Sequence, residues 1–408
     1  MALREELRNG PGGPLLEKFA AELSRVGYSK TSARRKIRGA EHLIYWSGRQ
    51  GVLISCLNNN FVKRFDHHLN RCKCPRFGHS HRLELINGAR SFLVFLRDIG
   101  EIAAFVAEST LQDPALLVAF SEWMRQQRGT CNATLYNYSL SIRDLLKQFG
   151  EDPGSFHAQG LRQFILERSQ RCGWAAAKKS TTALRMFLRF LIAEGKCSAE
   201  LFGAIPVLAH WRLSSLPRYL QPEKVEQIIS CCDPNSPVGR RDRAILLMLA
   251  RMGLRAGDIA QLRLNDIDWQ GAKICVSGKG RREVQLPLTQ EVGNALMAYL
   301  KDGRPPTDTD VLFIRSLAPF CAFRRSHAAV SAIVAQAMRR AGVTCQNRGA
   351  AHVLRHSAAT SMLRNGASLQ EIAALLRHRS IETTQIYAKV DVNTLREIAQ
   401  PWPEVQPC

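Results

Sequence analysis

The first two hundred residues contain a diverged internal repeat, which limits what the N-terminal half of the chain can fold into. Each copy has a helix start just after a glycine, apolar residues at a spacing of three to four, and a glycine where its last helix should stop. The offset is 102 residues between Gly27 and Gly129 and 95 between Gly100 and Gly195. Such a period predicts two duplicated helical bundles rather than a solenoid. The matching pieces begin at Gly27, Phe61 and Ser91 in one copy and at Gly129, Leu161 and Arg185 in the other.

The chain is strongly basic, with 57 Lys and Arg against 35 Asp and Glu and a formal net charge of +22 over 408 residues. Folding does not require this imbalance, so it indicates a polyanionic partner, most commonly nucleic acid. A membrane surface is the alternative, but the apolar runs are broken by charges or too short to span, and no apolar signal segment is present at the start. The twelve cysteines follow no disulfide framework. We therefore expect a soluble, cytoplasmic protein with reduced thiols and no membrane partner.

A change of pattern near residue 201 predicts a basic linker and then a domain of mixed type. The stretch from Leu201 to Leu220 is irregular and contains Pro206 and Pro217. Helical patterns follow from Pro222 and over 241–252, and a glycine-flanked hairpin is expected over 272–288. The alternating apolar residues Ile274, Val276, Val284 and Leu286 fit two short strands joined at Gly278-Lys279-Gly280.

Two basic residues of this third domain occupy turns where they can reach a phosphate. Arg255 follows Gly253, which is expected to end an apolar helix, and a guanidinium held in a turn can bind a phosphate through two hydrogen bonds. The alternative is a simple ion pair between Arg255 and Asp258. Lys279 lies at the tip of the hairpin and could donate a proton to a leaving oxygen, or it could be a solvated turn lysine. A P-loop is excluded because Gly280 stands where Ser or Thr belongs.

Three further basic groups share one helix face near the C-terminus. His352, Arg355 and His356 are spaced i, i+3 and i+4, and Asn365-Gly366 supplies the helix stop. So many cationic or proton-carrying groups on one face are unfavourable without an anion. A capping box from Ser368 to Glu371 then predicts a helix ending near Leu376, with His378 at its exit, where it could merely complement the helix dipole.

Tyr387 lies seven residues after Ser380, which is expected to cap one more helix, so that the tyrosine would lie about two turns along it. A tyrosine near the end of a chain is most often a core or surface residue. By itself this residue would not indicate a function.

Together these elements resemble the tyrosine recombinase and phage integrase family over about Leu220 to Val390. The family pattern is an Arg in a Gly-x-Arg-x-x-acid turn, a Lys in a hairpin, His-x-x-Arg, a His or Trp, and a Tyr nine residues later. The matching catalytic positions here are Arg255, Lys279, His352, Arg355, His378 and Tyr387, with Asp258 as the acid. Two departures are Asp258, where Glu is more usual, and Arg377, which replaces a common glycine.

The resemblance implies a mainly α fold with a small β-hairpin sheet in the catalytic domain (α+β). The expected parts are an extra helical, SAM-like module over 1–110, a core-binding helical domain over 111–205, a linker over 206–220 and the catalytic domain over 221–408. The two helical modules would bind DNA, the core-binding one clamping the duplex together with the catalytic domain.

The resemblance also implies strand cleavage through a 3′-phosphotyrosyl link on Tyr387, with His352 as the base and Lys279 as the acid for the departing 5′ oxygen. No metal, ATP or other cofactor is expected for this chemistry. The expected partners are duplex DNA with specific recombination sites and further copies of the chain, as a tetramer on DNA, or other recombinases. The process would be integration, excision or transposition of a mobile element. Alternatives are a type IB topoisomerase and a DNA-binding regulator that no longer cuts.

A separate cluster in the first copy could bind zinc. Cys72, Cys74, His79 and His81 lie within ten residues, and His67 or His68 could supply a further ligand. The spacing is not that of a standard zinc finger, so a metal-free structural role is the alternative, and we assign no metal from the sequence.

Overall fold

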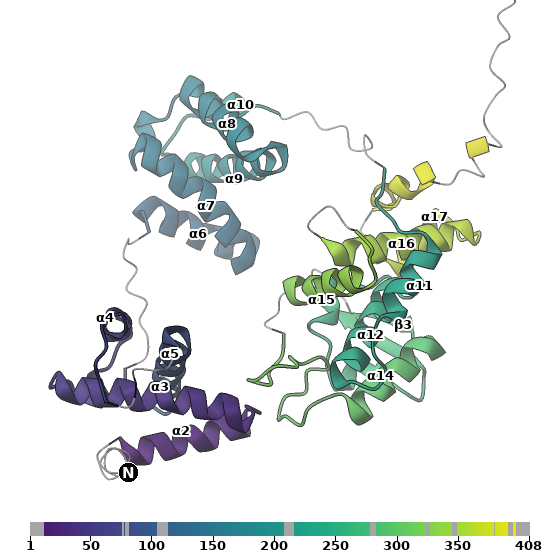
Figure 1. The fold of residues 1–408 in the computed structure, drawn as a ribbon. Helices are drawn as coiled ribbons and strands as arrows, with labels where there is room; N and C mark the ends of the chain where they lie inside the picture. The colour runs from purple at the N-terminus through teal and green to yellow at the C-terminus, as the bar shows by residue number, and fades with distance from the viewer. Residues whose placement is uncertain are drawn as a thin grey trace, which may run out of the picture. The chain divides into compact units, whose positions relative to one another are not determined.

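A computed structural model describes residues 12–75, 77, 81–103, 113–207, 216–277, 283–323, 327–344, 349–378, 380–390 and 395–396. The chain divides into two compact units, one formed by Phe105–Arg212 and the other by Met1–Ala104 with Leu213–Cys408. Figure 1 shows helices along the chain and labels strand β3 among the elements of the C-terminal part. The expectation of a mainly α chain with a β-hairpin sheet is confirmed.

The first copy of the repeat folds into helices around one apolar core. Ser29 accepts a hydrogen bond from the Ser32 amide and so caps α3, directly after Gly27 with its left-handed φ of +89°. Helix α3 crosses α5 very closely, because a Cβ on Gly39 would lie 2.8 Å from the Gly88 Cα. The helices are α2 (Gly13–Arg25), α3 (Lys30–Arg49), α4 (Asn59–Leu69) and α5 (Arg82–Asp98), with the 3₁₀ turn η1 at Ile54–Cys56.

The second copy repeats this order of helices in the other compact unit. Gly129 ends α6 in a left-handed conformation with φ +55°, in the position that Gly27 holds in the first copy. Helix α7 packs on α9 through buried small residues, and the Ser141 and Ser180 hydroxyls lie 3.0 Å apart there. The elements are α6 (Ala115–Arg128), α7 (Asn132–Phe149), η2 (Pro153–Ser155), α8 (Ala158–Cys172), α9 (Trp174–Ala193) and α10 (Glu200–Ala204).

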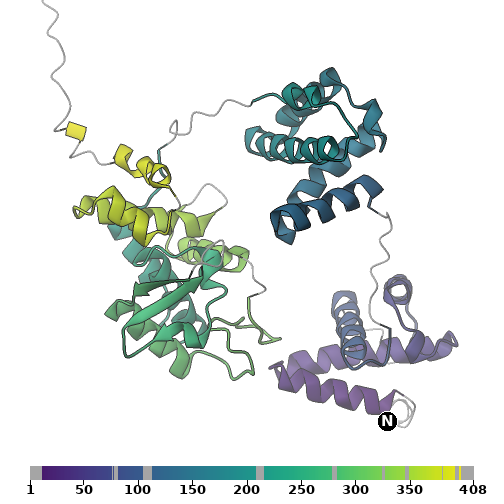
Figure 2. The ribbon, with the colours of Figure 1, turned by 180° about the vertical axis from the view of Figure 1, so that it is seen from behind.

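The C-terminal part combines helices with a small antiparallel sheet of order β1-β2-β3, on the face seen in Figure 2. The two strands of the expected hairpin are present, and their register places Ile274 opposite Leu286 and Val276 opposite Val284. The strands are β1 (Ile267–Asp268), β2 (Lys273–Ser277) and β3 (Glu283–Pro287). The helices are α11 (Pro222–Ser230), α12 (Pro237–Ala250), α13 (Ala256–Ile259), α14 (Gln290–Asp302), α15 (His327–Arg340), α16 (Ala350–Arg364) and α17 (Leu369–Leu375), with 3₁₀ turns η3 (Leu264–Asp266), η4 (Ile381–Thr383) and η5 (Gln385–Val390).

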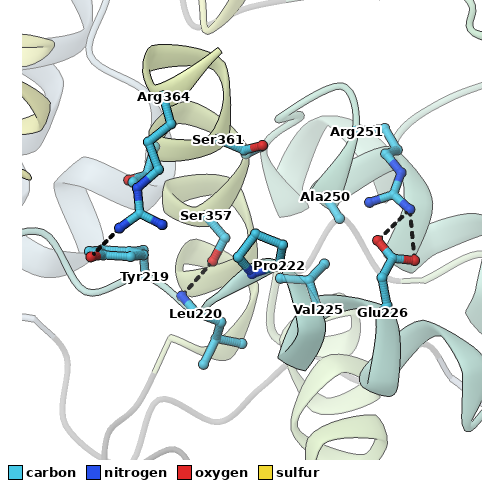
Figure 3. A pocket seen from close by; sticks show the side chains of 12 residues that line it. Tyr219, Leu220, Pro222, Val225, Glu226, Ala250, Arg251, Ser357, Ser361 and Arg364 are labelled. Atoms are coloured by element: carbon cyan, nitrogen blue, oxygen red, sulfur yellow. Dashed lines mark hydrogen bonds and ion pairs between the residues drawn. The ribbon is translucent and has the colours of Figure 1, made fainter. Parts of the chain in front are cut away.

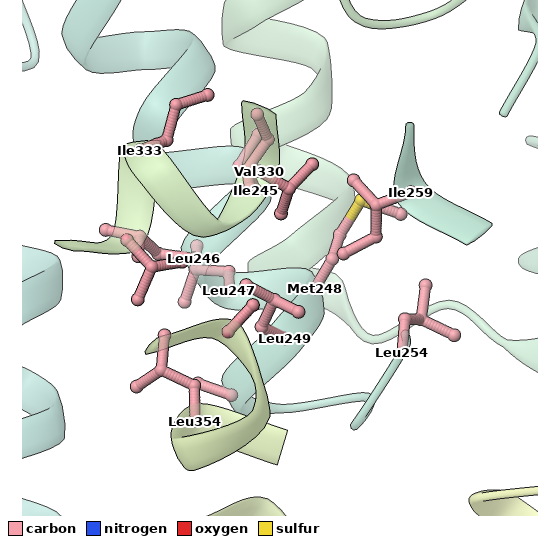
Figure 4. Close-up of a cluster of buried hydrophobic side chains, with 14 of the residues drawn as sticks. Ile245, Leu246, Leu247, Met248, Leu249, Leu254, Ile259, Val330, Ile333 and Leu354 are labelled. Carbon is pink, nitrogen blue, oxygen red and sulfur yellow. The ribbon is translucent and has the colours of Figure 1, made fainter. Parts of the chain in front are cut away.

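Helix α12 forms the centre of the core of this part. Leu246, Leu247 and Met248 are consecutive and all fully buried, because α11, α14, α15 and α16 pack around the helix (Figure 4). Burying each such side chain stabilises the fold by about 1.5–3 kcal/mol. The chain leaves this core at residue 251 and turns back at Gly253, so the packing of α12 determines where the following Arg255 can lie.

The helix expected after Ser380 is instead the pair of 3₁₀ turns η4 and η5, in which the Ser380 hydroxyl accepts from the Glu382 amide.

The end of the expected linker is anchored on α16, where the Leu220 amide donates to the Ser357 hydroxyl and Arg364 to the Tyr219 hydroxyl. These contacts line a pocket that contains none of the expected catalytic residues (Figure 3). Within the described residues, no helix is long and apolar enough to cross a membrane.

Candidate active site

Arg255 is held in the turn that follows α12. Gly253 has φ +61°, and a Cβ there would lie 2.6 Å from a methyl carbon of Leu376, so glycine lets the two loops approach each other. Arg255 is the N-cap residue of α13, and its Nη2 donates to the Arg377 carbonyl at 3.0 Å. The turn therefore directs this guanidinium toward the segment that precedes the tyrosine.

Arg355 of α16 lies beneath the same two loops and is only 5% exposed. Its Nη1 donates to the Gly253 carbonyl, and its Nη2 donates to the Leu376 carbonyl at 2.6 Å. Carbonyl oxygens orient a guanidinium without neutralising it, and three of its five N–H groups remain for another acceptor. Arg355 therefore ties the turn after α12 to the end of α17 and keeps its charge.

Tyr387 is buried, at 1% exposure, and its ring packs with Ala359, Ile372 and Leu376. Its hydroxyl lies 2.7 Å from Nδ1 of His356. The structure thus places His356, not the expected base His352, against the phenol. His352 is an exposed residue of the same helix, with its ring 6.4 Å from that of His356.

His378 follows α17 and is held by a second hydroxyl. Its Nδ1 lies 2.8 Å from Oγ1 of Thr384, which is fully buried between η4 and η5. The Thr384 carbonyl in turn accepts from the Tyr387 amide at 3.0 Å. This threonine therefore links the orientation of His378 to the backbone that carries the tyrosine.

Asp258 pairs with Arg377 rather than chiefly with Arg255. Arg377 Nη2 donates to Asp258 Oδ2, whereas Arg255 Nη1 lies 4.0 Å from that oxygen. Arg377 has a left-handed φ of +53°, which explains physically why a glycine is suited to its position. Its Nε and Nη1 are buried without a hydrogen-bond partner.

The described part of the site has an excess of positive charge. The Arg377 guanidinium pairs with the Asp258 carboxylate, whereas the buried Arg355 guanidinium donates to carbonyl oxygens, which do not neutralise its charge. Buried charges without counterions are unfavourable, so this arrangement suits an anionic ligand. Lys279, expected at the hairpin tip, lies outside the described residues.

Comparisons with known proteins identify the family. The model of the phage integrase family matches residues 218–394. The Sinorhizobium fredii protein y4rA, named as an integrase/recombinase, is 35% identical over 97% of both chains. The chain belongs to the phage integrase family of tyrosine recombinases. The tyrosine recombinase XerC of Oceanobacillus iheyensis is 34% identical over 68% of this chain and 92% of its own.

The fold of this family member also resembles solved recombinase structures. The XerH site-specific recombinase, in a post-cleavage complex with a palindromic difH substrate, matches 84% of this chain and 95% of its own with a TM-score of 0.56 at 19% identity. A lambda integrase dimer bound to a COC′ core site matches 72% of this chain and 98% of its own with a TM-score of 0.53 at 18% identity. These likenesses concern the fold.

The local environment keeps the histidines of this integrase-family site neutral. Burial, with the positive charges of Arg355 and its neighbours, lowers the pKa of His356 and of His378 to about 4. The pKa of His352 is lowered in the same way, although part of its surface remains exposed. Burial raises the pKa of Tyr387 to about 12, and the nearby Arg355 opposes this rise. At neutral pH the phenol is therefore protonated and His356 is neutral, so the phenol can donate a hydrogen bond to the imidazole.

Burial lowers the pKa of Arg355 to about 10, which still leaves the group charged at neutral pH. The described site of this recombinase-family chain therefore relies on arginines for its positive charge.

Sequence reasoning missed two members of this site. The sequence pattern places His356 on the same helix face as His352 and Arg355, and this i, i+4 spacing from His352 is a signal for a site residue. The pattern does not indicate the contact of His356 with Tyr387. Thr384 carried no signal, because only the packing of η4 against η5 brings its hydroxyl to His378.

Proposed function

We propose that the chain is a site-specific recombinase that cuts and rejoins DNA through a 3′-phosphotyrosyl intermediate on Tyr387, for integration, excision or transposition of a mobile element. The observation that carries this proposal is the buried Arg355 guanidinium, which carbonyl oxygens hold beside the Tyr387 phenol without neutralising it. A phosphodiester has one negative charge, and attack by a phenolate adds a second at the pentacoordinate phosphorus. The site thus complements the charge of that state.

In this proposal Arg255 and Arg355 bind the non-bridging oxygens of the scissile phosphate. Arg355 uses two of its five N–H groups on backbone carbonyls. His352 and His378 add donors around the same phosphate. A bound phosphate would raise the pKa of His378 by supplying a negative charge.

The proton transfers follow from the contacts of Tyr387. The phenol gives its proton to Nδ1 of His356, the oxygen forms its bond to phosphorus, and the bond from phosphorus to the 5′ oxygen breaks. Lys279 protonates the departing 5′ oxygen. A 5′ hydroxyl from a second strand reverses these steps with new connectivity, so neither ATP nor a catalytic metal is needed.

The proposed partner is duplex DNA carrying specific recombination sites, bound by a tetramer of the chain alone or with other recombinases. The net charge of +22 supports a polyanionic partner. The similar XerH and lambda integrase structures are complexes with recombination-site DNA. We propose that the modules over 1–110 and 111–205 bind DNA, that 206–220 is a linker and that 221–408 is the catalytic domain.

The decisive experiment replaces Tyr387 by Phe and traps covalent DNA adducts on a denaturing gel. Tyr387→Phe should form no adduct while binding DNA almost as the wild type does, because only the nucleophilic oxygen is lost. Tyr299→Phe is a matched control, since Tyr299 is another fully buried tyrosine of this part of the chain, and it should still form the adduct. An adduct formed by Tyr387→Phe would refute the assignment.

Cleavage should persist in excess EDTA, because arginines meet the charge on phosphorus. Complete loss that magnesium restores would indicate a metal nuclease instead. Exchange between two paired sites, as opposed to relaxation of a single duplex, would separate a recombinase from a type IB topoisomerase. A chain that binds a cognate site but never cuts it would be a regulator.

A further inference from the structure

Four potential metal ligands converge in the first helical module, far along the sequence from the catalytic residues. They are His42 of α3, His68 of α4, and Cys72 and Cys74 in the segment after α4, and their ligand atoms all lie within 4.8 Å of one another. Cys72 Sγ lies 3.5 Å from His42 Nε2, and Cys74 Sγ lies 3.3 Å from His68 Nε2. Two imidazoles and two thiols therefore surround one point.

This set differs from the one that the sequence suggested. Cys72 and Cys74 belong to both, but His81 is exposed at the N-cap of α5, outside the cluster, and His79 lies outside the described residues. His67, a suggested spare ligand, is exposed, whereas its neighbour His68 lies in the cluster. The fourth member, His42, is thirty residues from Cys72 and was not considered, because only the packing of α3 against α4 brings it close.

We propose that His42, His68, Cys72 and Cys74 form a structural Zn²⁺ site. Zinc held tetrahedrally at about 2.3 Å from sulfur and about 2.0 Å from nitrogen separates neighbouring sulfur and nitrogen ligands by about 3.5 Å. The two sulfur–nitrogen distances in the cluster match that edge length. A tetrahedral site of two thiolates and two imidazoles suits zinc better than the oxygen-preferring magnesium or calcium.

The surroundings of the four residues favour a closed, structural site. His42 is fully buried, and its ring stacks on Phe77 with centroids 4.2 Å apart. The His68 ring stacks on Trp46 at 5.1 Å. The Cys74 amide points at Cys72 Sγ at 3.4 Å, a contact that stabilises a thiolate. Four protein ligands leave no open coordination position for a substrate.

The metal would link the segment after α4 to both α3 and α4. The segment after α4 contributes Cys74 and Phe77 as buried residues, while its neighbours 71, 73 and 75 are exposed. Zinc would connect this segment to α3 and α4 at once. Binding would release the protons of both thiols as the thiolates coordinate, so the step needs no oxidant or reductant.

The first test measures metal in the full chain, purified with a reductant and without added chelator. We expect about one zinc per chain by elemental analysis. Stripping the metal and titrating Co²⁺ should then produce the intense d–d absorption of a tetrahedral centre with thiolate-to-cobalt charge transfer, saturating at about one equivalent. A reduced chain that holds no zinc and develops no such spectrum with Co²⁺ would overturn the proposal.

Variants locate the site. Cys72→Ser, Cys74→Ser and His42→Ala should each lose the bound zinc or weaken Co²⁺ binding at least tenfold. Cys56→Ser and His67→Ala are matched controls in the same module, exposed and outside the cluster, and should keep the metal. If a ligand variant fails to fold, the Co²⁺ spectrum of the wild type still reports the ligand types. Zinc fully retained by the double variant Cys72→Ser, Cys74→Ser would place the metal elsewhere and refute the site.

Discussion

At the scale of single residues, two histidines of the candidate site are kept neutral at neutral pH by their surroundings. His356 and His378 have pKa values lowered to about 4, below the ordinary value near 6.5, because they are partly buried beside arginines. Above about pH 6.5 both are neutral in the folded and unfolded chain. Below that pH the two histidines become protonated in the unfolded chain but stay neutral in the folded chain. This difference in proton binding favours the unfolded state.

We therefore predict that the free energy of unfolding falls as the pH drops from about 6.5 toward about 4. Denaturant titrations across this range should show a shallower pH dependence for His356→Gln than for the wild type. His157→Gln changes an exposed histidine of the other compact unit and should keep the wild-type dependence. An unchanged slope in His356→Gln would contradict the lowered pKa.

Arg377 combines an unfavourable backbone conformation with a buried ion pair. Arg377→Gly and Arg377→Ala both remove the pair with Asp258, but only glycine relieves the left-handed φ of +53°. We predict that the glycine variant is more stable than the alanine variant by about 1 kcal/mol, measured by denaturant unfolding. Equal stabilities would mean that the backbone is not held in this conformation.

Both Arg377 variants free the Asp258 carboxylate to attract Arg255, which lies 4.0 Å away. Cleavage should therefore fall to a similar extent in the two, even though their stabilities differ.

At the scale of elements, the β2–β3 hairpin is the part that would deliver the proposed acid. Its strands pair from Lys273 opposite Pro287 to Ser277 opposite Glu283, and Lys279 lies between them in sequence. We predict that Lys279→Ala slows cleavage of an ordinary phosphodiester but not of a substrate with sulfur in place of the 5′ bridging oxygen. A thiolate, whose conjugate acid has a pKa near 8.5, leaves without a proton donor.

The matched control for the hairpin is Lys273→Ala, which changes an exposed lysine on β2. This variant should cleave both substrates at wild-type rates. If the sulfur substrate fails to rescue Lys279→Ala, this lysine binds DNA rather than donating the proton.

At the scale of the whole molecule, the extra helical module would lengthen the stretch of DNA that the chain contacts. In the first copy, Arg35 pairs with Glu84 and Lys36 donates to the Ser91 hydroxyl, so these two cations have partners within the module. Lys30 and Arg34 are exposed near the start of the same helix. They are the residues of this group best placed to contact phosphates beyond the core site.

We predict that a chain beginning near Leu111 keeps cleavage but protects a shorter stretch of a cognate site in footprinting. The double variant Lys30→Glu, Arg34→Glu should weaken binding and reduce its salt dependence, because fewer counterions are released. Lys18→Glu changes another exposed lysine of the module, on α2, and should have less effect. Equal footprints for the full and shortened chains would assign the first hundred residues to assembly or to a partner protein.

The sequence by itself determined the features that depend on short-range pattern. The spacing of apolar residues and glycines predicted the repeated helices, alternating apolar residues predicted the two strands of the hairpin, and the capping box at Ser368 predicted the start of α17. These patterns arise because a helix or hairpin is stabilised by contacts between residues close in sequence. The family was indicated differently, by the resemblance of the motif residues to the pattern of tyrosine recombinases.

Only the tertiary structure decided which polar groups meet. Asp258 pairs with Arg377 across 119 residues, and His42 joins Cys72 across thirty, distances over which no local pattern carries information. The tyrosine segment formed 3₁₀ turns instead of the predicted α-helix, with Tyr387 packed against Leu376 and bonded to His356 of α16. In each case the partner was set by long-range packing. Most buried polar groups form hydrogen bonds, and the fold determines which partners lie within reach.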